Sequence, residues 1–166
     1  MRKNTDRAFL GFALMWREEE FLLKAKENLL SEYGSILSQS EIFNPPVSKY
    51  YQREMGFPLL KRFIITDRVI DKSEIKGIKK LCMEIEDSFR INGSRTVNID
   101  PFYIDPDQLV VSTKKYRGNR IYLGDGVYAE LELFYHHGSF QPFIWTYLDY
   151  KQQIPFFNSV RNFLKL

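Results

Sequence analysis

The chain is poor in the residues that build covalent or metal-based frameworks. Its 166 residues include one cysteine, Cys82, and two histidines. A single cysteine excludes an intramolecular disulfide, so packing must hold the fold together. Cys82 lies on the apolar stripe of a predicted helix, and we interpret it as a small buried hydrophobe instead of a reactive thiol.

Long apolar runs and a strong excess of one charge are absent as well. No stretch approaches the roughly 18 apolar residues of a membrane-spanning helix, and the start has no long apolar region with a cleavage site. The net charge is +3, from 24 basic and 21 acidic residues that are spread along the chain. We therefore expect a cytoplasmic protein with no membrane partner, and nucleic acid is a poor candidate.

The composition instead favours an ordinary globular core. Hydrophobic residues make up 44% of the chain and aromatic residues 16%, which is enough for a large buried interior. We find no internal repeat, low-complexity segment or linker. The sequence predicts one α+β domain that spans residues 1–166.

Apolar residues in the first hundred positions alternate between strand and helix periods. The pattern predicts two helices, one ending near Gly34 and one over 75–89, and strands at 8–14, 36–43, 60–69 and 96–99. Asp71 and Glu74 form a capping box before the second helix. The resulting order β-α-β-β-α-β is that of a ferredoxin-like split βαβ.

The rest of the chain predicts an antiparallel meander. Short strands are expected at 109–112, 120–123, 127–135 and 140–147, followed by a final helix that Pro155 opens. Alternation within 127–135 should put Leu131 and Leu133 on one buried face, as the helical stripe should bury Ile78 and Ile85. The predicted fold is a ferredoxin-like core extended by this meander and helix.

Polar residues that can bind an anion occur on or beside the predicted strands. The candidates combine basic and hydroxyl groups that form charge-assisted hydrogen bonds, and they are Ser112, Thr113, Lys114 and Arg120. Arg95 and Asn98 would orient the bound molecule. The alternative is that these residues are ordinary solvated strand ends.

Three carboxylates are candidates for chemistry. Asp100, Glu130 and Asp149 would act as a general base or bind a cation if folding brought them together. Their spacing follows no metal-ligand pattern, so we predict no metal site, and nothing in the sequence names a cofactor. The structural alternative is turn capping by the Asp side chains and a salt bridge from Glu130 to Arg120.

Aromatic residues form two further candidate sets. The segment 48–60, with Tyr50, Tyr51 and Glu54, follows neither period, and we predict a long loop that serves as a lid or an interface. Its tyrosines could equally pack on the sheet. Tyr122 and Tyr147 lie on predicted strands and could contact a ligand, but the chain has neither an RNP1 motif nor a Walker-type phosphate loop.

Five consecutive segments resemble the prokaryotic family described as domain of unknown function 4416. They are YYQREMG (50–56), RTVNIDP (95–101), VVSTKKYRGNRIYL (110–123), GVYAELELFY (126–135) and WTYLDY (145–150). The resemblance places any shared site among the residues that fit the pattern: Asp100, Ser112, Thr113, Lys114, Arg120, Tyr122, Glu130, Tyr147 and Asp149. It implies no defined activity beyond loose nucleotide-binding labels on some members.

The chain departs from that family's pattern at three positions. Phe102 stands where the pattern has Gly, Asn119 where it has His, and Leu148 where it has Pro. A general-base role for that His cannot apply here. We therefore expect a domain that binds a small anionic molecule, such as a nucleotide or another phosphate-bearing compound, with enzymatic activity left open. The alternative is a non-catalytic interaction module, with a homodimer joined through the edge of the meander.

Overall fold

The computed structural model describes residues 3–46 and 48–166, which form an antiparallel sheet flanked by helices. Within this part of the chain the sheet has eight strands in the order β2-β3-β1-β4-β5-β7-β6, and β8 also pairs with β7. Their bounds are β1 Arg7–Trp16, β2 Ile36–Gln39, β3 Leu60–Asp71, β4 Val97–Ile104, β5 Gln108–Thr113, β6 Ile121–Gly124, β7 Val127–His136 and β8 Ser139–Pro142. The predicted α+β class, with an antiparallel sheet, is confirmed.

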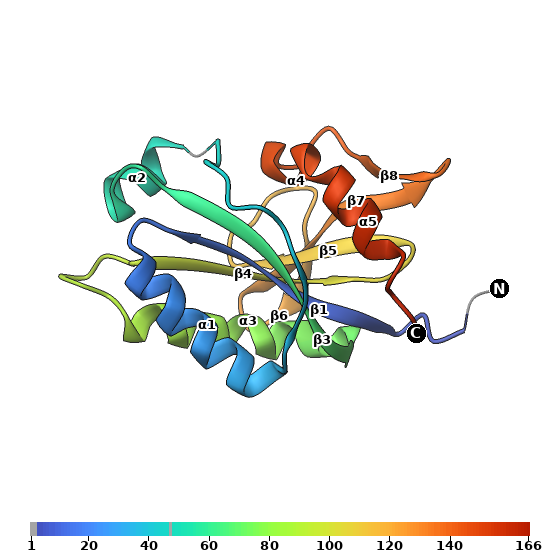
Figure 1. Ribbon diagram of the computed structural model, residues 1–166, viewed down its shortest axis with the longest axis horizontal. Coiled ribbons are helices and arrows are strands. Elements are labelled where there is room, and N and C mark those ends of the chain that lie inside the picture. The colour runs from blue at the N-terminus through green and yellow to red at the C-terminus, as the bar shows by residue number, and fades with distance from the viewer. Residues whose placement is uncertain (1–2, 47) are drawn as a thin grey trace.

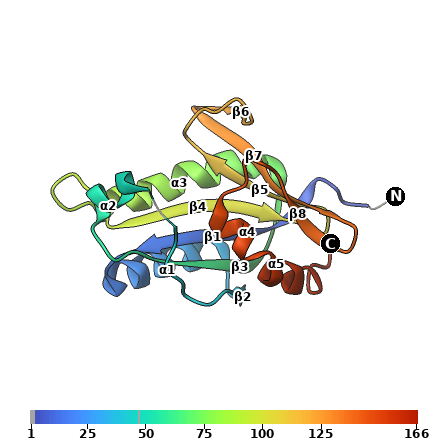
Figure 2. The same ribbon diagram turned by 90° about the horizontal axis from the view of Figure 1, so that it is seen from above.

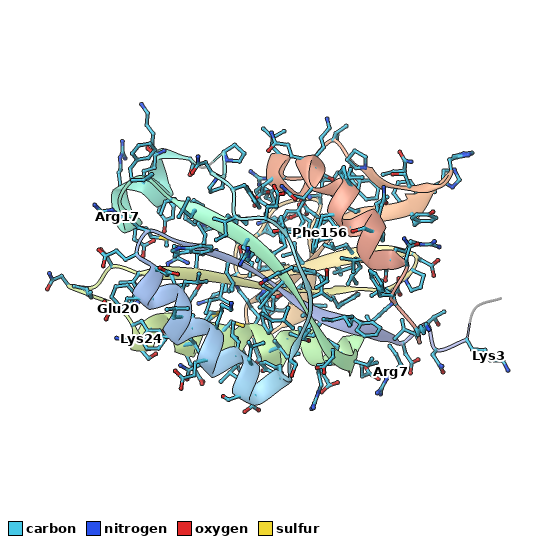
Figure 3. The ribbon with its side chains drawn as sticks, in the orientation of Figure 1. Lys3, Arg7, Arg17, Glu20, Lys24 and Phe156 are labelled. Carbon is cyan, nitrogen blue, oxygen red and sulfur yellow. The ribbon has the colours of Figure 1, made fainter. Side chains whose placement is uncertain are left out.

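Helices cover both faces of this sheet. The helices are α1 Glu19–Tyr33, α2 Lys49–Met55, α3 Ile75–Ser88, α4 Leu148–Gln152 and α5 Ile154–Arg161. Figures 1 and 2 show α1 and α3 beneath the sheet, with α2, α4 and α5 on the opposite side. Charged residues of α1 such as Glu20 and Lys24 point away from the sheet (Figure 3) and pair at 3.0 Å. No helix in the two described ranges has the length and apolar character to span a bilayer.

The central strand β1 is buried on both faces. Leu10, Phe12, Leu14 and Trp16 pack with α1 and α3. On the other face, Phe9 and Ala13 pack in a second core with α5, and Met15 packs with Met55 and Leu59. This position explains why β1 is a continuous apolar run with no polar face. The second core contains Phe102, whose ring covers Gly11. A Cβ atom on Gly11 would lie 2.5 Å from that ring, so glycine is required there.

Several local predictions from the sequence are confirmed. The carboxylate of Asp71 accepts a hydrogen bond from the Ser73 amide, while the side chain of Glu74 accepts one from the Asp71 amide at 2.7 Å, as in a capping box. The first helix ends at Tyr33, because Gly34 adopts a positive φ of 108°. Ile78 and Ile85 are buried in the core beneath the sheet.

Several predicted segments were wrong in kind or extent. The strand expected at 36–43 ends at Gln39, and the strand expected at 96–99 continues to Ile104. Part of the expected loop 48–60 is the helix α2, which buries only Met55 and has no side-chain N-cap. Such a short helix leaves little apolar periodicity in the sequence. The expected strand 140–147 ends at Pro142, and residues from Leu148 on are helical.

A bulge in β7 breaks the predicted alternation. Leu109 of β5 pairs with Leu133, but the next residue, Val110, pairs with Leu131, so Glu132 has no partner in β5. An extra residue reverses which side chains face each side of the sheet. As a result Leu133 is buried, Leu131 is only half-buried, and Glu132 is fully buried where a solvent-facing residue was expected.

Candidate functional site

A cleft opens where strands β4 and β5 part. The two strands pair only over 102–104 of β4, although β4 stays paired with β1 as far as Val97 and β5 stays paired with β7 as far as Thr113. Pro101 has no amide hydrogen with which to continue the ladder, and its carbonyl accepts a hydrogen bond from Ser112 Oγ at 3.0 Å. The sheet therefore forks beyond Phe102, beside a cleft of about 830 Å³.

At the fork, where β5 no longer pairs with β4, two side chains of α3 form hydrogen bonds with the backbone of β4. Glu86 Oε2 accepts a hydrogen bond from the Ile99 amide at 2.7 Å, and Lys79 Nζ donates one to the Ile99 carbonyl at 3.4 Å. Both side chains are buried, and they lie about two helical turns apart on one face of α3. They satisfy backbone groups that would otherwise be buried without partners.

Asp100 forms the accessible acidic part of the cleft floor. About 30% of its side chain is exposed, and its two oxygens accept hydrogen bonds from Lys79 Nζ at 3.1 Å and from Asn98 Nδ2 at 3.0 Å. Asn98 is itself held by Arg95 Nη1 at 2.7 Å. Burial alone would raise the pKa of Asp100, but the ammonium groups of Lys79 and Lys61 hold it below its ordinary value.

A second buried ion pair lies beside Asp100. Lys61 of β3 pairs with Asp149 of α4, and about 10% of each side chain is exposed. The Lys61 ammonium also lies 5.5 Å from the ring centroids of Phe63 and Tyr150. Burial raises the pKa of the Tyr150 hydroxyl well above its ordinary value, so Tyr150 stays neutral beside the pair.

Arg120 connects several residues of the cleft wall. Its guanidinium donates to the Tyr147 hydroxyl at 2.6 Å and to the Lys115 carbonyl at 2.7 Å. Glu130 Oε2 lies 3.4 Å from Arg120 Nη2, and Glu130 Oε1 accepts a hydrogen bond from Asn119. Since only 2% of the Arg120 side chain is exposed, Arg120 positions the loop after β5 more than it faces the cleft.

The loop between β5 and β6 carries cations at the mouth of the cleft. Lys114, Lys115 and Arg117 are exposed, and within residues 3–46 and 48–166 none of them forms an ion pair. Lys115 Nζ lies 4.5 Å from the ring centroid of Tyr50, and the Arg117 guanidinium lies 5.9 Å from that of Tyr147. The mouth therefore combines uncompensated positive charge with aromatic rings.

The helix α2 borders the other side of the mouth. Glu54 accepts hydrogen bonds from Arg95 Nη2 at 2.9 Å and Nε at 3.1 Å, and from the Arg95 amide at 3.0 Å. Hydrogen bonds from Arg95 hold the pKa of Glu54 below its ordinary value. Tyr51 is half-buried, and burial raises the pKa of its hydroxyl. This set of contacts ties α2 to the end of β4.

Nearly all of the predicted site residues line this one cleft. Those that do are Tyr50, Tyr51, Glu54, Arg95, Asn98, Asp100, Ser112, Thr113, Lys114, Arg120, Glu130, Tyr147 and Asp149. Tyr122 lies elsewhere, 60% exposed on β6, where its hydroxyl accepts a hydrogen bond from the Gly126 amide at 3.2 Å.

The three candidate carboxylates do not act as a group. Asp100 pairs with Lys79, Asp149 with Lys61, and Glu130 lies against Arg120. In the described part of the chain no three His, Cys, Asp or Glu side chains are arranged to hold a metal ion. Each of the three carboxylates therefore lies against a basic residue of its own.

Sequence reasoning missed four buried charged residues at or behind the cleft: Lys61, Lys79, Glu86 and Glu132. Glu132 is the bulged residue of β7, and its Oε1 accepts a hydrogen bond from the Tyr147 amide at 2.6 Å. Its Oε2 has no hydrogen-bond partner within the described residues. Burial, together with the neighbouring Glu130 and Asp149, raises the pKa of Glu132 to about 8.

Comparison with known families adds to this geometry. The family model described as Domain of unknown function (DUF4416) matches residues 6–163. The chain belongs to this family. The DUF4416 match extends over every strand and helix around the cleft. No curated protein and no solved structure matches the chain.

Two of the residues at which we expected the chain to depart from the family pattern have a clear structural setting. Asn119 donates a hydrogen bond to Glu130 and so belongs to the same wall as Arg120. Phe102 fills the space above Gly11 in the second core. Neither residue offers a titratable group to the cleft.

Proposed function

We propose that the cleft binds a small anionic molecule, with its negative charge at the mouth. The observation that carries this proposal is the group of three exposed cations, Lys114, Lys115 and Arg117, which have no acidic partner in the described part of the chain. Lysine and arginine side chains gathered on one short loop provide several donors for a phosphate or carboxylate. A cleft of about 830 Å³ lies within the range of small-molecule sites.

The charges inside the cleft favour an anion at the mouth over an anion at the floor. Lys61 and Lys79 are each compensated by a carboxylate, Asp149 and Asp100. An anion at the floor would meet these carboxylates at close range, whereas an anion at the mouth meets uncompensated cations. Electrostatics therefore orients the ligand in the cleft.

Binding is supported better than proton abstraction. Glu130 is fully buried and Asp100 is the more accessible carboxylate, but the lowered pKa of Asp100 makes it a weak base. An enzymatic role would therefore rest on Asp100 as an orienting acceptor more than as a base.

Isothermal titration calorimetry with pyrophosphate tests the proposal. We expect a triple variant with Lys114, Lys115 and Arg117 changed to Gln to bind pyrophosphate at least about tenfold more weakly than the unmodified chain. A control variant removes the same charge elsewhere, with Lys24, Arg68 and Lys165 changed to Gln. Equal weakening in both variants would mean that only net charge matters, and no binding by the unmodified chain would refute the proposal.

We also propose that residues 7–104 form a ferredoxin-like unit. The spatial order β2-β3-β1-β4, with antiparallel neighbours throughout, supports this interpretation. The unit would supply β4, and the meander would supply β5, so that the cleft lies at their junction.

A second candidate function is a homodimer joined through β6. The observation that favours it is the apolar edge of the sheet, where Ile121 is 68% exposed and Tyr122 is 60% exposed. Edge strands that carry no charge are prone to pair with another chain. Light scattering after size-exclusion chromatography distinguishes this candidate, because Ile121→Lys would convert a dimer into a monomer without affecting pyrophosphate binding.

A further inference from the structure

The floor of the cleft has the chemistry of a site for neutral polar groups. Lys61 and Lys79 contribute two positive charges, and Asp100 and Asp149 contribute two negative charges. The carboxylate of Glu86, beside Lys79, lies 3.6 Å from the guanidinium of Arg95, so this further pair leaves the balance unchanged. A ligand group with a net charge of either sign would gain little from this balanced set. A hydroxyl group, which both donates and accepts, matches it better.

Asp100 is the acceptor in this floor that a ligand can reach. About 30% of its side chain is exposed, against 10% for Asp149 and none for Glu130. Lys79 and Asn98 each occupy one position on its two oxygens. An ionised carboxylate has about four acceptor positions, so further ones stay open toward the cleft.

Resting on the proposed function, we infer that the anion is the phosphate of a phosphorylated sugar, whose hydroxyl groups donate to Asp100. The phosphate lies against Lys114, Lys115 and Arg117, and the sugar extends toward the fork. The sugar phosphate is either a free molecule or part of a nucleotide.

The geometry of β5 gives the spacing that this ligand needs. Ser112 contacts the Pro101 carbonyl, next to Asp100, and Lys114 stands two residues further along the chain. Lys114 lies in the bend directly after β5, which ends at Thr113. Two residues of chain span at most about 7 Å, which is comparable with the separation of the phosphate and the ring hydroxyls in a pentose phosphate. The strand thus connects the anionic and the neutral parts of the site.

Aromatic rings at the mouth of the cleft provide a way to distinguish a nucleotide from a free sugar phosphate. Tyr50, Tyr116 and Tyr147 line the cleft, and 56%, 68% and 42% of these residues is exposed. Base stacking on exposed rings is worth about 1–3 kcal/mol per base. If the natural ligand is a nucleotide, its base stacks on these rings and the nucleotide binds more tightly than the corresponding sugar phosphate.

Calorimetry with paired ligands tests the inference on the unmodified chain. We expect ribose 5-phosphate to bind about tenfold more tightly than butyl phosphate, which carries the same anion without hydroxyl groups. Equal affinities would overturn the inference and leave the anion-binding function intact. If neither ester nor pyrophosphate binds, the proposed function fails as well. Adenosine 5′-monophosphate binding more tightly than ribose 5-phosphate identifies the nucleotide source, and equal or weaker binding identifies the free sugar phosphate.

The variant Asp100→Asn tests the residue itself. It should remove the advantage of ribose 5-phosphate while the affinity for butyl phosphate stays the same or increases, because a negative charge has been removed near the anion. Asp125→Asn is the matched control, since Asp125 pairs with Lys76 and Lys80 outside the cleft. If Asp100→Asn still bound ribose 5-phosphate about tenfold more tightly than butyl phosphate, the role of Asp100 would be overturned.

Discussion

Individual charged residues around the cleft are buried with partners that the sheet brings from distant parts of the chain. Lys61 of β3 meets Asp149 of α4, and Lys79 of α3 meets Asp100 of β4. Removing one member of such a pair leaves an uncompensated buried charge, which costs about 3–5 kcal/mol. These residues therefore contribute to the stability of the fold as well as to the chemistry of the cleft.

Glu132 gives the protein a pH-dependent stability that a single substitution can reveal. Its pKa is raised to about 8 by burial and by Glu130, whereas in the unfolded chain it titrates near 4.5. Between these two values the folded state keeps a proton that the unfolded state has lost. Raising the pH through this window therefore lowers the free energy of unfolding, by up to about 1.4 kcal/mol per pH unit.

Glu132→Gln should remove this contribution, because the amide stays neutral at every pH. Urea unfolding from pH 5 to pH 8 should show the variant gaining stability relative to the unmodified chain as the pH rises. The exposed Glu84→Gln on α3 serves as control and should show no such trend. A stability difference for Glu132→Gln that is constant across this range would contradict the prediction.

Residues near the cleft differed in how far the sequence could identify them. Polar residues between Arg95 and Asp149 were predicted as a group because they lie at strand ends, where binding residues concentrate. Lys61 and Lys79 were missed because each stands next to another basic residue, Arg62 or Lys80, in an element with several charges. The sequence does not show which of these charges is buried, because the partner of each lies far away in the chain. Glu132 was missed because nothing in the pattern of 127–135 indicated a bulge.

At the scale of elements, α2 stands out because its attachment is polar. Met55 is its one buried residue, and the helix is held by Glu54 bound to Arg95 and by Lys115 near the rings of Tyr50 and Tyr51. Elements with few buried apolar contacts open more readily than those of the core. We therefore expect amides of α2 to exchange hydrogen faster than those of β7.

The variant Glu54→Gln should loosen α2 selectively. Loss of a hydrogen bond between charged groups costs about 1.5–3 kcal/mol, so exchange in 49–55 should accelerate about tenfold or more while β7 is unchanged. Pyrophosphate should slow exchange in α2 of the unmodified chain if it binds at the mouth. Glu27→Gln on α1 is the control, and protection of α2 equal to that of β7 in both forms would refute the prediction.

Elements were predictable where their period is long and their ends carry specific signals. The helix α3 has a sustained apolar stripe and a capping box, and β1 and β3 are long runs of apolar and β-branched residues. The helix α2 has seven residues and no cap, so its local preference is too weak to identify it. The end of β8 at Pro142 depends on contacts such as that of Trp145 Nε1 with the Leu131 carbonyl at 2.9 Å, which no local pattern encodes.

Over the whole molecule, the sheet separates two cores, and α3 belongs to one of them. Ile85 is 8% exposed within the core beneath the sheet. Ile85→Asp places a charge there without a partner, which costs at least about 4 kcal/mol and approaches the total stability of a small domain. We expect this variant to lose soluble expression and cooperative thermal unfolding.

Ile91→Asp is the matched control, because Ile91 is 52% exposed in the turn after α3. It should express and unfold like the unmodified chain. Circular dichroism and yield of soluble protein provide the measurement. A folded Ile85→Asp protein would show that α3 does not pack as the sequence and structure indicate.

The hydrogen bonds from α3 to Ile99 also limit which molecules the fork can admit. An open strand edge normally recruits an extended peptide, which adds to the sheet through its backbone. Here Glu86 already accepts from the Ile99 amide, and Lys79 already donates to the Ile99 carbonyl. A peptide segment entering the fork would find the amide and the carbonyl of Ile99 already bonded, so we expect the cleft to exclude extended polypeptides.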